Sequence, residues 1–399
     1  MEEAVYVIFF NALKGGTMKQ AKLTVTIALL VSSYSVLAEH AFDFDMEYTG
    51  IYQGLASGTP TKTADFFHRL DMKASVDFEK LSMWENGKLS AQLQAHNGGH
   101  NTFGINGSPY FSPNSAAFLS EDLFLSSLYY SHQFSQGAFL LGKIDAFELL
   151  KDGEFYGGAG RYGFMNLAFS APPSGVVPPA FIGLVANWQT TPVNWTAMIY
   201  DPRNRYTSDH FSEIFQDGIN LSLTASKDLK ILDRNSNVSL TATYSTEEGK
   251  DLDNLVDPTA YASGKYNLRA QVSHNIYEDA ANPANAWGVY IRAAVADGNP
   301  NLLSGTFSGG IGGSALIPHR VNDQWGVGYF LHNISNSAQD SINGQIGEFE
   351  IRNEQGVEAF YSYAVTPSIH ITGDMQYLQA MDSSEKHALI FGLRTNIKF

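Results

Sequence analysis

The sequence predicts an all-β protein: a transmembrane antiparallel β-barrel of about 16 strands around one aqueous lumen. Three observations support this prediction: an aromatic composition poor in charge, an N-terminal export signal, and a two-residue hydrophobic period that continues to the last residue. Charged residues make up 16 % of the 399 residues and aromatic residues 13 %, whereas globular domains average about 25 % charged residues. The mean hydropathy is only −0.15, and no apolar run outside the N-terminus reaches about 18 residues, which excludes a helical membrane protein.

Composition also excludes several functional classes. The chain has no cysteine, which excludes disulfide scaffolds, zinc ribbons and thiol enzymes. Its formal net charge of −15 offers no basic surface for nucleic acid. We expect no cofactor and no metal, because His96 and His100 lie in a glycine-rich loop without a carboxylate partner. Gly157-Gly158-Ala159-Gly160 likewise lacks the strand-to-helix context of a phosphate loop.

The N-terminus has the pattern of a signal peptide. Residues 18–38 carry Lys19 and Lys22, then a short apolar core, then Val36 and Ala38 at the −3 and −1 positions of a cleavage site. We expect cleavage near Ala38 and a single barrel domain over residues 39–399. Residues 1–17 begin with acidic residues where a signal peptide needs basic ones. Of the two possible starts, Met1 and Met18, this favours Met18, with residues 1–17 an upstream extension outside the translated protein.

The C-terminal segment distinguishes a membrane barrel from a secreted one. Successive side chains of a strand point to opposite faces, and a barrel in lipid turns its apolar side chains outward and its polar side chains toward the lumen. Residues 389–399 alternate in this way and end on Phe399. A terminal Phe that closes such a strand looks like the recognition signal of the outer-membrane barrel-assembly machinery.

Seven further segments show the same two-residue period. They are residues 42–49, 89–96, 219–226, 266–273, 287–293, 357–362 and 369–377. Runs of about 8–11 residues suit tilted membrane strands, whereas strands of soluble sandwiches average about 5–6 residues. Because lipid cannot satisfy a free strand edge, the sheet must close. A chain of this length accommodates roughly 16 strands, and a barrel of that size leaves an aqueous lumen.

Glycine, proline and polar clusters separate the predicted strands. The predicted loops are residues 98–113, 171–179, 201–205, 279–285, 297–300 and 333–347, with a further Ser/Thr/Gly loop from Leu55 to Ala64. Aromatic residues fall at the ends of the predicted strands, where interfacial girdles belong. They include Trp188, Trp195, Trp287, Trp325 and Tyr377.

The alternation predicts which charged side chains face the lumen. A charged residue that faced lipid would cost about 2–4 kcal/mol at mid-depth, so the polar parity of each strand must point inward. The inward set is Lys143, Asp145, Arg269, Arg292, Glu358, His370, Asp374, Gln376 and Arg394. Each of these could contact solute or could form a structural charge pair that braces the wall or a loop. Arg161, Arg203 and Arg205 lie in loop-like stretches and are either solvated loop charges or folded inward.

The chain resembles the carbohydrate-selective outer-membrane porins of the OprB type from about Asp77 to Phe399. The matching pieces stand at residues 77–87, 141–145, 164–166, 200–202, 264–266, 293–302, 309–310, 316–323, 358–367, 375–378 and 388–399. Their order and spacing are more specific than any single piece. The start departs from the family pattern, because Phe42 to Gly54 is a plain alternating strand without the Gly/Trp/Arg-rich stretch that many members carry.

The resemblance implies a monomeric 16-stranded barrel in the outer membrane, with diffusive uptake of mono- or oligosaccharides through a constricted, partly Arg-lined lumen. It adds weight to Lys143, Asp145, Arg292, Arg320 and Glu358 as pore-lining residues, because they stand in matching pieces. The implied partners are sugars, outer-membrane lipid and the barrel-assembly machinery.

Two alternative functions remain open at the level of sequence. Within the porins, a general or anion-preferring pore is the near neighbour. An outer-membrane barrel enzyme such as a lipase would need a serine and a histidine held together with an orienting group. His132 beside Ser131 is the nearest candidate, and no nucleophile motif supports it. We therefore predict a channel and not an enzyme.

Overall fold

The structure is a computed structural model, and it describes residues 41–58, 64–98, 113–117, 123–153, 157–207, 211–314, 316–317, 319–346 and 350–399. The predicted extension 1–17, the signal peptide 18–38 and its cleavage site lie outside these residues, as does most of the predicted loop 98–113. No helix in the described part of the chain is long and apolar enough to span a bilayer.

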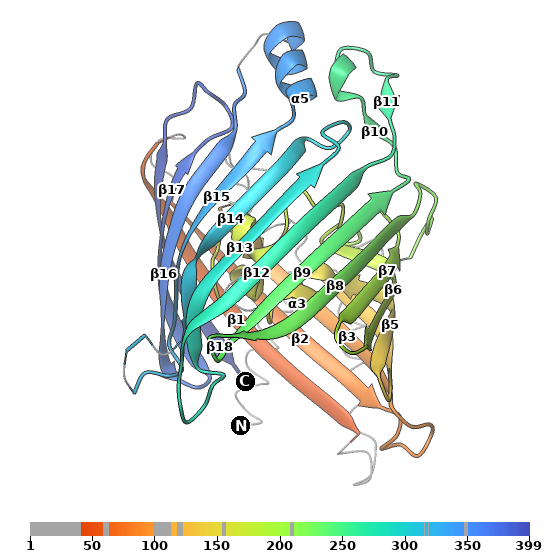
Figure 1. Ribbon diagram of the computed structural model, residues 1–399, viewed down its shortest axis with the longest axis vertical. Coiled ribbons are helices and arrows are strands. Elements are labelled where there is room, and N and C mark those ends of the chain that lie inside the picture. The colour runs from red at the N-terminus through yellow and green to blue at the C-terminus, as the bar shows by residue number, and fades with distance from the viewer. Residues whose placement is uncertain are drawn as a thin grey trace, which may run out of the picture.

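The described strands close into a single antiparallel barrel of 16 strands, which confirms the predicted fold class. Each strand pairs with its neighbours in the chain, and β1 pairs with β18 to complete the ring (Figure 1). The barrel strands are β1 (Phe42–Ser57), β2 (Ala64–Asp77), β3 (Gly87–Asn97), β4 (Leu123–Phe134), β5 (Gly137–Asp145), β6 (Ala180–Gln189), β7 (Asn194–Tyr200), β8 (Asn220–Ile231), β9 (Arg234–Ser245), β12 (Tyr266–Glu278), β13 (Ala286–Ala296), β14 (Leu303–Ser314), β15 (Gln324–Ile334), β16 (Glu354–Thr366), β17 (Ile369–Gln379) and β18 (Ala388–Lys398).

Short elements occupy the longer connections. They are β10 (Gly249–Lys250), β11 (Tyr261–Ala262), α3 (Ala146–Leu150), α4 (Leu167–Ser170), α5 (Asn336–Ser341), η2 (Ser115–Ala117), η3 (Gly158–Gly160), η4 (Leu252–Asn254) and η5 (Ile342–Ile346). The predicted loop at Leu55–Ala64 is wrong at its start, because β1 continues to Ser57 through a register shift between Leu55 and Ser57.

The seam between β1 and β18 joins the two ends of the sheet. Its register pairs Glu47 with Lys398. The backbone N–H of Phe399 donates to the carbonyl of Met46 at 3.0 Å, and the Asn396 side chain donates to Thr49 Oγ1 at 3.0 Å. Closure pairs the backbone groups that would otherwise form free edges, which is the condition for a sheet to exist in lipid.

The predicted alternation sets the two faces of the wall. On β13, Val289, Ile291 and Val295 are exposed, whereas Tyr290 and Arg292 between them are buried. The exposed apolar residues face outward, as a lipid-facing surface requires. Many inward residues are polar and yet buried, which means that other parts of the chain occupy much of the lumen.

The connections differ in length between the two ends of the barrel. The end that carries the C-terminus has short turns, and the opposite end has the longer connections with α5 and the β10–β11 hairpin (Figure 1). At the β8–β9 turn, Leu232 and Asp233 have positive φ of 51° and 61°, as a two-residue type I′ hairpin requires. Trp188 and Trp195 stack beside the β6–β7 turn, where the girdle was expected. Outer-membrane barrels place short turns at the periplasmic end.

Candidate functional site

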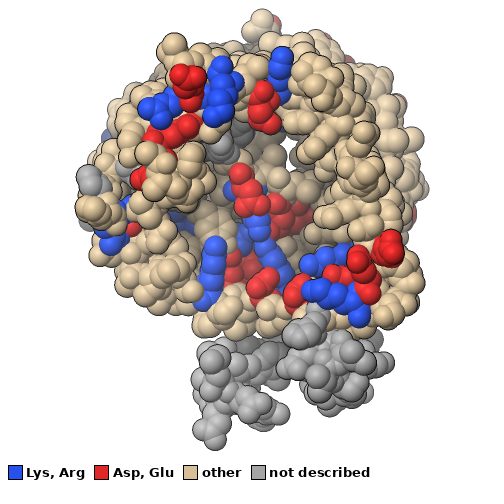
Figure 2. All heavy atoms as spheres, turned by 60° about the horizontal axis from the view of Figure 1, so that its bottom comes forward, with Lys and Arg blue, Asp and Glu red and all other residues tan. Residues whose placement is uncertain are grey.

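A long connection folds back inside the barrel. It joins β5 to β6 and contains α3, η3 and α4 (Figure 1). Its described residues, 146–153 and 157–179, are called the lumenal segment below. Its described polar groups contact inward-facing side chains of the wall. Viewed from the turn end, Lys, Arg, Asp and Glu side chains lie together within the hollow of the barrel (Figure 2).

Local sequence signals shape the lumenal segment. Asp145 caps α3, because its Oδ1 accepts from the N–H of Phe147 at 2.9 Å, and Asn166 caps α4 by accepting from Ala168 at 2.9 Å. Between the helices, Gly157, Gly158 and Gly160 have positive φ of 111°, 66° and 69°, which glycine adopts without steric cost. A Cβ at Gly160 would stand 2.3 Å from Ser115 Oγ. The glycine cluster therefore serves a tight turn.

Inward side chains of β13, β16 and β18 hold the backbone of this segment. The Glu358 carboxylate accepts from the N–H groups of Met165 and Asn166 at the start of α4. Arg292 donates to the carbonyls of Ala168 and Ala171 at the other end of the same helix, at 2.5 and 2.7 Å. Charges of these signs at these ends satisfy the free backbone groups of a helix.

Two more of the predicted inward residues reach the inserted chain near the β1–β18 seam. Arg394 donates to the carbonyl of Gly160 at 2.8 Å. Gln376 donates to the carbonyl of Pro113 at 2.9 Å and to Asp374 Oδ1 at 3.1 Å. Residue 113 precedes η2, whose Ser115 bonds to Met165, so residues 113–117, between β3 and β4, also lie in the lumen.

The inward direction of these residues agrees with the alternation, but their contacts are with protein. Arg292, Glu358 and Arg394 are nearly fully buried and brace inserted chain, which was the alternative left open for each. Asp374 is buried beside them and accepts from Gln376 of the wall. Asp145 is buried as well, and its second oxygen accepts from Gln94 at 2.7 Å. A direct role of these residues in solute contact stays a prediction.

Three predicted site residues stand apart from this cluster. Lys143 is buried near the loop end of β5 and donates to the carbonyl of Thr207 at 3.3 Å. His370 lies half-buried at the turn end of β17. Arg320 lies on the β14–β15 turn, pairs with Asp323 at 2.6 Å, and stacks 3.9 Å over the ring of the outward-facing Tyr363.

Arg320 is a turn residue and is not bound by the inward parity of a strand, and its role in lining the pore stays a prediction. Burial raises the pKa of Asp323, but hydrogen bonds from Arg320 and Tyr361, together with the Arg320 charge, outweigh it and hold this pKa below its ordinary value. The Arg320–Asp323 pair thus ties the turn to β16.

A buried charge network on β2, beside the β1–β18 seam, escaped the sequence analysis. Arg69 and Asp71 form a two-bond pair at 2.7 and 2.8 Å on the inward face of β2. Arg161 of the lumenal segment binds the same Asp71 at 3.1 Å and also binds Glu148. The alternation of Arg69, Asp71 and Lys73 along residues 64–77 is the signal that could have revealed this cluster.

Glu148 connects the network to two lysines at the turn end. It pairs with Lys73 at 2.5 Å and with Lys151 at 3.3 Å. Burial raises the pKa of Glu148, but the charges of Arg161, Lys73 and Lys151 outweigh it, so the pKa lies well below its ordinary value. Arg161 thus takes the inward of its two predicted positions.

The connection between β7 and β8 supplies a third inserted piece. Tyr206 accepts from Arg69 at 3.0 Å and donates to Gln94. Arg205 is buried and pairs with Asp201 at 2.5 Å, so it too folds inward. Arg203 remains a loop charge, pairing with Glu213 and Asp217 at partly exposed positions.

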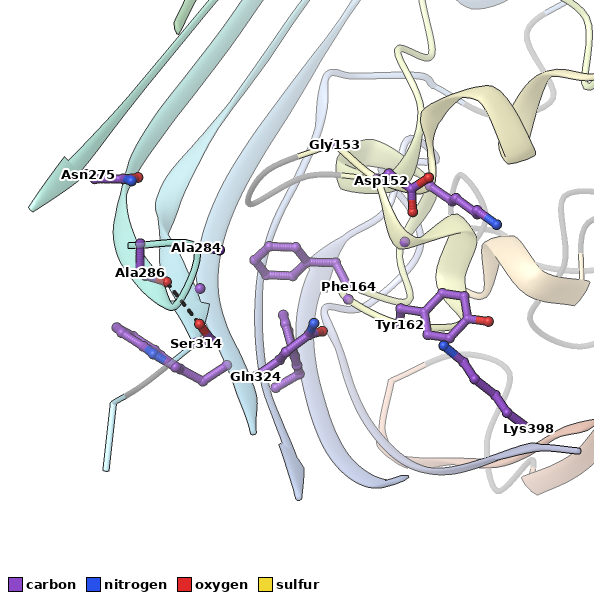
Figure 3. Close-up of a pocket in the computed structure, with 17 residues that line it drawn as sticks. Asp152, Gly153, Tyr162, Phe164, Asn275, Ala284, Ala286, Ser314, Gln324 and Lys398 are labelled. Carbon is purple, nitrogen blue, oxygen red and sulfur yellow. Dashed lines mark hydrogen bonds between the residues drawn. The ribbon is translucent and has the colours of Figure 1, made fainter. Parts of the chain in front are cut away.

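Cavities remain between the inserted chain and the wall. One of about 470 Å³ lies between the lumenal segment and β6–β12, and is called the central cavity below. A second, also of about 470 Å³, has Asp152, Tyr162 and Lys398 on one side, with Ser314 and Gln324 opposite (Figure 3). Arg269, predicted to face the lumen, lines the central cavity and donates to Thr241 at 3.2 Å.

Comparison with known families decides what kind of barrel this is. Residues 61–399 match the family described as carbohydrate-selective porin, OprB family. The chain belongs to this porin family. No curated protein matches the sequence.

Solved porin structures share the fold of this OprB-family chain. Pseudomonas putida OprB in its high-pH structure superposes with a TM-score of 0.78 at 17 % identity, covering 93 % of this chain and 97 % of that one. Its low-pH structure gives a TM-score of 0.58 at 13 % identity, covering 91 % and 94 %. Salmonella typhi OmpF gives 0.54 at 8 % identity, covering 90 % and 97 %.

As a member of this family, the chain is an outer-membrane channel for passive diffusion of carbohydrates and not an enzyme. The geometry of Ser131 and His132, the pair considered for a lipase, does not support a catalytic pair. Ser131 and His132 are consecutive on β4 and so point to opposite faces. Ser131 contacts the carbonyl of Lys88, whereas His132 contacts Tyr130.

Proposed function

We propose that carbohydrate crosses the barrel through the central cavity and contacts Arg269 and Gln271 on its way. The observation that carries this proposal is the lining of the β7–β12 wall. Thr196, Ser222, Thr224, Thr241 and Thr243 present hydroxyl groups along it. Hydroxyl, amide and guanidinium groups match the donors and acceptors of a sugar, and several modest contacts permit both entry and release.

The buried charges define the constriction in this proposal. Arg292, Glu358 and Arg394 fix the lumenal segment to β13, β16 and β18. The network of Arg69, Asp71 and Arg161 fixes it to β2, which follows β18 and β1 around the barrel. A segment held along this arc of the wall keeps a fixed distance from the β6–β12 wall across the lumen. The aperture for solute is thereby set by folding and not by the solute.

Arg269→Gln tests the path. In liposome swelling, we expect slower entry of glucose and maltose, and in planar bilayers weaker block of current by these sugars. Arg203→Gln is the matched control, because Arg203 lies partly exposed in the β7–β8 loop. Heat-modifiable migration on gels confirms that both variants fold. Sugar block and swelling rates that are unchanged in a folded Arg269→Gln variant would place the path elsewhere.

The remaining expectations belong to the same proposal. We propose a monomer that is exported by a signal peptide cleaved near Ala38 and assembled through recognition of the terminal strand. The alternating β18 and an exposed Phe399 support that recognition. Phe399→Ala should lower the amount of folded barrel in the outer membrane, whereas Phe211→Ala, at an exposed loop position, should leave it unchanged.

A further inference from the structure

We infer that the central cavity accepts glycosides that carry an apolar aglycone, such as aryl β-glucosides, in preference to unsubstituted sugars of similar size. This inference rests on the proposed path through that cavity. It adds a substrate class that differs chemically from free mono- and oligosaccharides.

The first observation is an exposed apolar surface on the lumenal side of the barrel. Exposed apolar side chains of a membrane barrel belong on the lipid face, yet Leu149 lines the lumen with 40 % of its surface exposed. Leu150, Pro172, Pro173 and Pro178 line the same cavity. All five belong to the lumenal segment, so the apolar surface lies along one side of the path.

Packing of the segment does not account for this surface. The buried apolar clusters around the cavity contain Ile144, Phe181 and Val185 on the wall side and Phe147 and Leu167 on the segment side. Leu149 and Leu150 belong to none of the clusters found in the described part of the chain. A single exposed leucine would need no explanation, but several apolar side chains that line one cavity opposite polar residues are typical of a ligand-binding surface.

The second observation is the polar surface that faces it. Ser222 bonds to Thr243 at 3.0 Å, and Thr224 bonds to Thr241 at 2.9 Å. These pairs form a row of hydroxyls across β8 and β9. Among the residues that line the cavity in the described ranges, Arg269 carries the single charge. The segment side of the cavity is therefore apolar, whereas the β8–β12 side is hydrogen-bonding and carries one cationic group, Arg269.

An amphipathic solute matches both sides at once. A sugar ring can lie against the hydroxyl row while an aromatic aglycone covers Leu149 and the prolines. A free sugar would leave the apolar side in water, and a plain hydrocarbon would cover the hydroxyls without hydrogen bonds. The volume of about 470 Å³ lies in the range of small-molecule sites, about 300–1,000 Å³.

Current block in planar bilayers tests the inference, with phenyl β-D-glucopyranoside, maltose, glucose and phenol as probes. We expect the phenyl glucoside to block at a concentration about tenfold below that of maltose, because an apolar contact is added to the sugar contacts. In Leu149→Ser this advantage should fall toward zero while glucose block stays unchanged. Leu149→Met, which keeps the apolar surface, should retain it.

Three results would overturn the inference: equal block by phenyl glucoside and maltose, an advantage that persists in a folded Leu149→Ser variant, or equal block by phenol alone. Its failure is distinguishable from failure of the proposed path. If glucose and maltose enter liposomes and their block depends on Arg269, but the aryl glucoside has no advantage, the path stands and only the aglycone preference falls.

Discussion

Arg161→Met is the most informative perturbation of the constriction. The Arg161 side chain is fully buried and bonds to Asp71 at 3.1 Å and to Glu148, with Glu47 at 3.5 Å. Methionine keeps much of the volume of the side chain and removes its charge. The change therefore separates the charge contacts from packing.

The expected loss of unfolding free energy depends on the ion-pair partners that Asp71 and Glu148 keep in the variant. Removing one partner from a buried ion pair costs about 3–5 kcal/mol because the other charge stays buried. In this protein Asp71 keeps both bonds from Arg69, and Glu148 keeps Lys73 and Lys151. We therefore expect a loss near the lower limit, about 3 kcal/mol, in the free energy of unfolding.

We expect the substitution to loosen α3 from β2, while the barrel itself stays closed. Glu358 and Arg292 still hold α4 in the variant, so the β2 side of the segment alone is released. We expect higher single-channel conductance and more current noise, with a barrel that still migrates as a folded species.

Arg203→Met is the control, because its partners Glu213 and Asp217 are exposed and solvent screens such surface pairs. Denaturant unfolding and planar-bilayer recordings measure both quantities. If Arg161→Met matches Arg203→Met in unfolding free energy and in conductance, the network does not hold the segment.

Two further substitutions test the other anchors. Glu358→Ala leaves two backbone N–H groups without their acceptor, at a cost of about 1–3 kcal/mol each. We therefore expect higher conductance or altered sugar block, with Glu358→Gln intermediate. Unchanged current in both variants would remove Glu358 from the constriction. Arg292→Ala should act in the same direction by releasing the carbonyls at the end of α4. At the turn end, the pKa of Asp323 lies below its ordinary value, so its stabilisation is present above about pH 3.9 and is lost as the pH falls through the lower folded-state value. Asp323→Asn should therefore reduce stability at neutral pH and narrow its gap from the wild type on acidification, which thermal unfolding from about pH 6 to about pH 2 would detect; a constant gap would contradict this.

The face of the wall to which a strand side chain points could be predicted from the sequence, because it depends only on the alternation between neighbouring residues. The period of two places Arg292, Glu358, Asp374 and Arg394 on the inward face, and the structure agrees. The high cost of a charge in lipid makes this inference robust for strands. It does not extend to turns, so the alternation could not predict that Arg320 lies over the ring of Tyr363.

The inserted chain could not be read in the same way. Arg161 binds Asp71, which is 90 positions away in the sequence. Glu358 accepts from Met165 and Asn166, which are 193 and 192 positions away. Capping residues such as Asp145 and Asn166 mark where α3 and α4 begin. A cap does not predict which part of the fold the helix packs against.

By itself, the order of residues determined a closed barrel with apolar residues outside and polar residues inside, because each strand must satisfy its own alternation in lipid. Tertiary structure alone decided what the inward charges touch, and it placed Arg292, Glu358 and Arg394 against an inserted segment. The physical reason is range: alternation acts between neighbours, whereas the contacts that shape the passage join parts of the chain that meet only after the barrel has closed.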